Sequence, residues 1–174
     1  MSLKRIDPLL AIARVILIII QVIAGVAAVA CTIAAPAILL FRAQVLAEVQ
    51  AEGIVPEALP VLAGMAAMGA VVLGMVFVVT LLCRRIVNTV GEGDPFVPEN
   101  ATRLSRMAWL MLAIQFISLP LAAGGVMLEQ MTEGKTVEAD GISLSAILLV
   151  IILFVLARVF RKGTEMRADL EGTV

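Results

Sequence analysis

Four long apolar stretches, separated by short polar segments, dominate the pattern of the chain. They cover about residues 15–41, 59–83, 107–128 and 142–160, and the uncharged core of the last one ends at Ala157. An α-helix rises about 1.5 Å per residue, so about 20 apolar residues cross the hydrocarbon of a bilayer. The pattern therefore predicts an all-α fold, an integral membrane four-helix bundle that forms a single membrane domain over residues 1–174.

The composition agrees with lipid as the main solvent of the chain. Hydrophobic residues make up 61% of it and charged residues 16%, and the mean hydropathy is +1.08. A soluble domain carries about 25% charged residues. The chain has no histidine, which is the commonest metal ligand and physiological-pH switch. Because no paired carboxylates, Ser-His-Asp set or metal-ligand cluster is evident either, we expect no enzyme activity, no metal site and no cofactor.

The basic residues are distributed unevenly between the polar segments. Eleven of the 13 lysines and arginines fall in the N-terminal flank, in the segment 84–106 and at the C-terminal end. In the segments 42–58 and 129–141, by contrast, most of the charged residues are acidic. Basic residues stay in the cytoplasm when short loops are sorted across a membrane. We therefore expect both termini, a loop at 84–106 and a tail at 161–174 to be cytoplasmic.

The loop 84–106 contains turn-forming residues followed by the start of a helix. Gly91, Gly93 and Asp94 favour a chain reversal, and Pro98 and Glu99 suit the first turn of a helix. This pattern predicts a short amphipathic cytoplasmic helix that lies at the lipid surface and runs into the third span.

Two cytoplasmic features are candidates for contacts outside the bundle. Arg103 and Arg106 share one face of the predicted helix, where they either meet anionic lipid head groups or belong to a docking surface. In the tail, Met166, Leu170 and Val174 follow one another at a spacing of four. This stripe is either a solvated helix end or a short peptide recognised by a cytosolic partner.

The spans contain no Asp, Glu, Lys or Arg at mid-depth. Since such charges are typical of proton relays and ion pathways, proton-coupled transport is disfavoured. Four uncharged polar side chains remain in the spans: Gln21, Thr80, Gln115 and Ser118. They either form hydrogen bonds between helices or line a polar pocket. Small residues at a spacing of four, such as Ala66, Ala70 and Gly74, allow close packing, either within the bundle or in a homo-oligomer.

The residues at 90–104 read VGEGDPFVPENATRL, and the chain ends in LEGTV at 170–174. Both stretches resemble those of a bacterial membrane family, domain-of-unknown-function family 2975, and the four spans occur in the same order. The resemblance implies a four-helix protein of a bacterial inner membrane. Because members are often encoded beside a small helix-turn-helix regulator, it also implies membrane control of a transcription factor. It supplies no catalytic residues.

The leading hypothesis is thus a membrane-embedded regulatory protein that binds or sequesters a small cytoplasmic helix-turn-helix regulator and does not itself bind nucleic acid. The residues expected to contact this partner are Asp94, Pro95, Phe96, Arg103, Arg106 and Leu170. Two alternatives remain: a small transporter or channel subunit, which would use the polar residues of the spans, and an immunity-type membrane protein that protects against a toxin.

Overall fold

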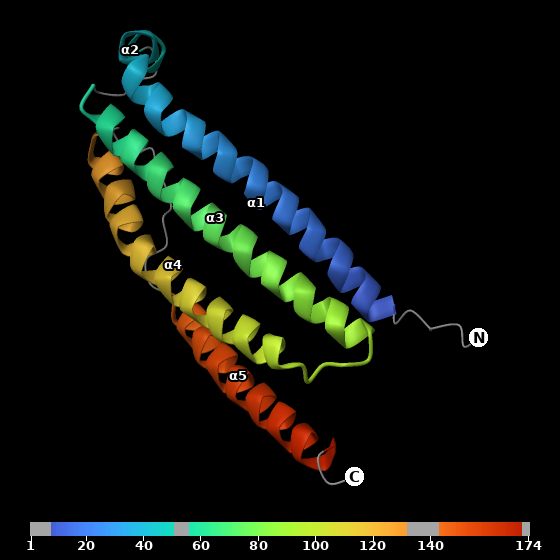
Figure 1. The fold of residues 1–174 in the computed structure, drawn as a ribbon. Coiled ribbons are helices and arrows are strands. Elements are labelled where there is room, and N and C mark those ends of the chain that lie inside the picture. Colours follow the sequence, from blue (N-terminus) through green and yellow to red (C-terminus); the bar gives the residue numbers. More distant parts are fainter. Residues whose placement is uncertain (1–7, 51–55, 132–142, 172–174) are drawn as a thin grey trace. The chain divides into compact units, whose positions relative to one another are not determined.

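The computed structural model describes residues 8–50, 56–131 and 143–171 (Figure 1). Its helices are α1 (Pro8–Leu40), α2 (Arg42–Gln50), α3 (Ala58–Gly91), α4 (Pro98–Met131) and α5 (Leu144–Glu171), and no strand occurs in the described ranges. Outside these ranges lie Lys4 and Arg5 of the basic N-terminal flank, Lys135 of the segment 129–141, and the final Gly172-Thr173-Val174.

Four of the helices are long and apolar enough to cross a membrane, namely α1, α3, α4 and α5. The shortest of these four candidate spans has 27 residues, which exceeds the roughly 20 that a bilayer requires. The prediction of an all-α fold with four membrane-length helices is confirmed. The chain is a multi-pass membrane protein.

The helices extend beyond the apolar stretches that predict them. The second stretch ends near residue 83, but α3 continues to Gly91, and α5 continues past residue 160 to Glu171. Extending an existing helix adds one hydrogen bond for each residue that is fixed, and arginine, lysine and glutamate are good helix formers. The apolar length therefore marks the span, whereas the helix itself runs on through charged turns.

The amphipathic segment before the third span is the beginning of α4. The helix starts at Pro98 with Glu99 in its first turn, as predicted, and continues without interruption to Met131. Neither glycine nor a further proline occurs before Pro120, so nothing separates a surface helix from the span. Arg103 and Arg106 therefore lie on the same helix as the third apolar stretch.

The sequence did not predict α2. The apolar pattern predicts only a short polar segment between the first two spans, but residues 42–50 form a helix. Alanine, leucine, glutamine and glutamate, which dominate this segment, all favour helix. The backbone N–H groups of Gln44 and Val45 both donate to the Phe41 carbonyl at 3.0 Å. Only Phe41 separates the two helices, so α2 begins almost where α1 ends.

The chain divides into two compact units. One contains residues 1–23, 76–112 and 144–174, and the other contains residues 24–75 and 113–143. In the second unit, the Gln115 side chain of α4 accepts a hydrogen bond from the Ser143 backbone N–H at 3.1 Å. Also in that unit, a Cβ at Gly124 would lie 3.0 Å from Cγ of Met65, so α4 and α3 approach closely there. The first unit contains the turn after α3 and the whole of α5.

A hydrogen-bonded glycine turn ends α3. The Gly93 N–H donates to the Val90 carbonyl at 3.0 Å, and the Asp94 N–H donates to the Thr89 carbonyl at 3.1 Å. This pair of bonds is the Schellman arrangement, which requires a left-handed residue just after the helix. Gly93 has a φ of 90°, so it fulfils that requirement without the strain that a Cβ would cause.

We expect Gly93→Ala to lower the free energy of unfolding by about 1–2 kcal/mol, the cost of a left-handed conformation in a residue with a Cβ. Gly91→Ala is the matched control. Its Cβ would lie 3.8 Å from Leu10 Cδ1, an ordinary contact, and alanine is the better residue inside a helix. Thermal unfolding in detergent should show a lower melting temperature for the first variant alone. Equal losses in both would contradict the assignment of the turn.

Candidate functional site

A buried apolar cluster joins α3, α4 and α5 in the first unit. It consists of Leu82, Leu104, Met107, Ala108, Leu153 and Ala157. The three members from α4 follow at spacings of three and one, which places them on one side of the helix. This cluster holds the three helices together, and Phe160 of α5 packs against it.

The Asn100 side chain forms hydrogen bonds to the residues around the turn. This side chain is fully buried. The amide nitrogen donates to the Thr89 hydroxyl at 2.7 Å and to the Pro95 carbonyl at 2.9 Å, while the amide oxygen accepts from Arg103 at 2.7 Å. One side chain thus links α3, the turn and α4. Sequence reasoning missed both Asn100 and Thr89.

The Phe96 side chain packs against α5. Its ring lies 5.4 Å from the ring of Phe160, centroid to centroid, at an interplanar angle of 44°. A Cβ added at Gly163 would lie 2.6 Å from Cδ1 of Phe96, which is too close for any real contact. Gly163 therefore provides the space in which the ring lies. The turn is held on the C-terminal half of α5 by this contact.

Asp94 and Arg167 form an ion pair between the turn and α5. The two side chains are 42% and 48% exposed, respectively, and ion pairs in such positions contribute only about 0–1 kcal/mol. The pair therefore orients the turn on α5 more than it stabilises the fold.

A groove of about 230 Å³ lies between the turn and α5. We call it the loop–tail groove. It is lined by Asp94, Phe96, Val97, Pro98, Thr164, Arg167 and Ala168. Apolar and charged groups are mixed along it, as is typical of surfaces that bind polypeptide partners.

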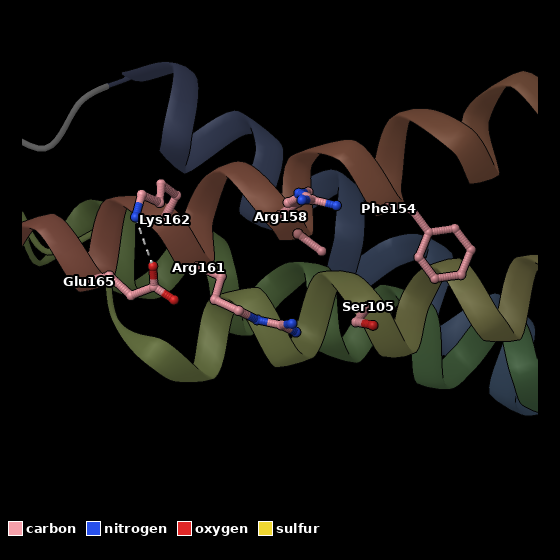
Figure 2. Close-up of a pocket in the computed structure, with 7 residues that line it drawn as sticks. Ser105, Phe154, Arg158, Arg161, Lys162 and Glu165 are labelled. Carbon is pink, nitrogen blue, oxygen red and sulfur yellow. Dashed lines mark hydrogen bonds and ion pairs between the residues drawn. The ribbon is translucent and has the colours of Figure 1, made fainter.

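A larger hollow, of about 610 Å³, lies on α4 and α5. We call it the basic hollow. Figure 2 shows the residues that line it: Ser105, Phe154, Ala157, Arg158, Arg161, Lys162 and Glu165. The Lys162 ammonium lies 3.2 Å from the Glu165 carboxylate, and the two arginines lie between this pair and Phe154 (Figure 2).

The sequence-predicted partner contacts occupy different situations in the structure. Asp94 and Phe96 contact α5, through Arg167 and Phe160 respectively. The Pro95 carbonyl and the Arg103 guanidinium are both hydrogen-bonded to the Asn100 side chain. Arg106 is exposed and lines a separate cleft together with Arg85. Leu170 lies near the end of α5 and is 72% exposed.

The four polar residues of the spans bind mainly locally. Thr80 and Ser118 donate to carbonyl groups of their own helices, at 2.9 and 2.7 Å. Gln115 binds the Ser143 backbone, and the buried Gln21 Oε1 has no hydrogen-bond partner in the described ranges. Within the described part of the chain, no hydrogen bond joins two of these side chains to each other. The described residues also contain no group of three or more residues able to hold a metal ion.

The family model described as protein of unknown function (DUF2975) matches residues 45–174. The chain belongs to this family. Comparisons with curated proteins and with solved structures find no match. All residues of the loop–tail groove and of the basic hollow lie within the part that matches DUF2975, whereas α1 lies before it. The DUF2975 region thus includes the turn after α3 together with the helix on which it packs.

Proposed function

We propose that this DUF2975 protein is a membrane-embedded regulator that binds a small helix-turn-helix transcription factor at the loop–tail groove. In this proposal the protein lies in the inner membrane of a bacterium with the groove on the cytoplasmic side. The concentration of arginine and lysine in the segments around the groove supports that orientation.

The proposal rests on the contacts between the turn and α5, which make the two segments one continuous surface. Phe96 lies on Gly163, and Asp94 pairs with Arg167. Two segments that are 67 to 73 residues apart in the chain are thereby held in one arrangement. A surface that is already ordered loses less entropy when a partner binds than two independent peptides would.

The charges near the groove indicate what kind of surface the partner presents. Arg85 and Arg106 are exposed, and the cleft that they line shares Pro98 with the groove. A helix-turn-helix protein contacts DNA through a basic face, which these arginines would repel. The partner would therefore dock through an acidic or neutral face, because opposite charges favour encounter and like charges disfavour it.

The proposal is tested by isolating the tagged protein from its native membrane in a mild detergent and identifying bound proteins by mass spectrometry. We expect a small DNA-binding protein. Ala168→Trp fills the exposed groove and should reduce its recovery about tenfold or more, as for a disrupted interface centre. Leu148→Trp is the matched control: Leu148 is exposed on the same helix but does not line the groove, so recovery should remain unchanged.

Two outcomes would contradict this function. Equal recovery with both tryptophan variants would remove the groove as the docking site. Absence of any soluble partner in repeated isolations would favour the membrane-intrinsic alternatives, a transporter or an immunity-type protein. These two would then be separated by flux in proteoliposomes and by toxin resistance after deletion.

A further inference from the structure

The charges in the basic hollow are not balanced. The one carboxylate among the described residues that line it, Glu165, is already paired with Lys162. Arg158 and Arg161 form no ion pair with any residue of the described ranges. They are three residues apart and so share one side of α5, and Figure 2 shows Arg161 extending across α4 towards Ser105. The hollow therefore presents two uncompensated positive charges.

The same side of α5 changes from basic to apolar within about one turn. Phe154 and Ala157 line the hollow just before the two arginines. Beside them runs an exposed apolar stripe at a spacing of four: Ile151, Val155 and Val159. A ligand that matches this order of groups has an anionic end and a hydrocarbon end. A small soluble anion would satisfy the arginines alone.

Trp109 indicates the depth of the hollow in the membrane. Its side chain is 61% exposed, and its ring meets that of Phe154 nearly edge-on, with the centroids 5.4 Å apart and an interplanar angle of 82°. Tryptophan is enriched where the hydrocarbon of a bilayer meets the head groups. The Phe154 end of the hollow therefore lies at that boundary, and Arg158 and Arg161, which follow Phe154 on α5, lie on its head-group side.

From these observations we infer that the basic hollow is a binding site for the phosphate of an anionic glycerophospholipid. Arg158 and Arg161 bind the phosphate oxygens, since guanidinium groups can donate two parallel hydrogen bonds to phosphate. Ser105, whose hydroxyl has no hydrogen-bond partner in the described ranges, supplies a further donor. The acyl chains lie along the apolar stripe of α5. The volume of about 610 Å³ is within the range of about 300–1,000 Å³ that is usual for ligand clefts. This site is distinct from the loop–tail groove and does not depend on the proposed regulator.

Trp109 is the single tryptophan of the chain, so its fluorescence reports on lipids beside the hollow. The full-length protein is placed in nanodiscs of phosphatidylcholine that contain a small fraction of either brominated phosphatidylglycerol or brominated phosphatidylcholine. Bromine quenches tryptophan at short range. We expect phosphatidylglycerol to bind about tenfold more strongly than phosphatidylcholine, since each basic residue near an anionic lipid strengthens binding several-fold.

The paired substitution Arg158→Gln with Arg161→Gln should abolish this preference. The matched control, Arg84→Gln with Arg85→Gln, removes the same charge from α3 without touching the hollow and should retain the preference. If the first pair does not give a monodisperse protein, Arg158→Lys with Arg161→Lys keeps the charge but loses the paired donors. The preference should then fall about threefold or more.

Three results would overturn the assignment. Equal losses in the glutamine variant and in its control would indicate general attraction of basic residues to the bilayer. Loss of quenching upon addition of millimolar inorganic phosphate would indicate a site for a soluble anion. Unchanged lipid preference together with lost recovery of a soluble partner would indicate that the arginines bind protein instead.

Discussion

Asn100→Ala is expected to lower the free energy of unfolding by roughly 2–4 kcal/mol. The variant loses three hydrogen bonds at a fully buried position. Each such bond contributes about 0.5–1.5 kcal/mol, and a buried donor or acceptor that is left without a hydrogen-bond partner costs more. Thermal unfolding in detergent, followed by circular dichroism, measures the loss.

Two further variants separate the hydrogen bonds from the packing. Asn100→Asp preserves the volume and the oxygen that faces Arg103, but it places an oxygen where nitrogen donates to Pro95 and Thr89. It should therefore destabilise the protein as well. Thr102→Ala alters an exposed residue of the same helix and should change the stability by less than about 0.5 kcal/mol. A fully stable aspartate variant would contradict the role assigned to Asn100.

Gly163→Ala should destabilise the protein by about 1–3 kcal/mol, the usual cost of overpacking. Its Cβ would come within 2.6 Å of Cδ1 of Phe96, so the ring must leave α5 and the turn loses its anchor. In a Phe96→Ala background the obstruction is absent, and alanine is favoured over glycine inside a helix by about 0.5–1 kcal/mol. The same substitution should therefore become stabilising.

This reversal of sign is measured with a double-mutant cycle of thermal unfolding. A single effect on helix propensity would give the same sign in both backgrounds, and a general defect in folding would give additive losses. Either pattern would contradict the contact between Phe96 and Gly163. The reversal of sign, in contrast, is expected only if the Phe96 ring packs on Gly163.

The spans and the candidate site differ in how far the sequence predicts them. An apolar run long enough to cross a bilayer has few alternatives to a helix, since every backbone group in lipid needs a hydrogen-bond partner. The start of α4 was predicted for a similar local reason, because Pro98 and Glu99 favour a helix N-terminus. Polarity was the wrong criterion at 42–50, where residues that favour helix form α2 in spite of it.

The contacts that build the site depend on residues far apart in the chain, and no local pattern encodes them. Asn100 resembles any other polar residue near a helix start until Thr89 and Pro95 are placed beside it. Gly163 offered one signal: a glycine inside a helix, among good helix formers, usually has a packing reason. That signal indicates that something approaches α5 there, but it does not identify Phe96.

The most direct test of the proposed docking surface is photo-crosslinking in living cells, with a photoreactive amino acid at position 168 in the loop–tail groove. Position 148, exposed in the apolar part of the same helix, is the control. The account predicts that position 168 captures a small soluble DNA-binding protein, that position 148 does not, and that Gly163→Ala abolishes the capture. An adduct of that protein at both positions, or at neither, would contradict the claim that the turn and α5 together form its docking surface.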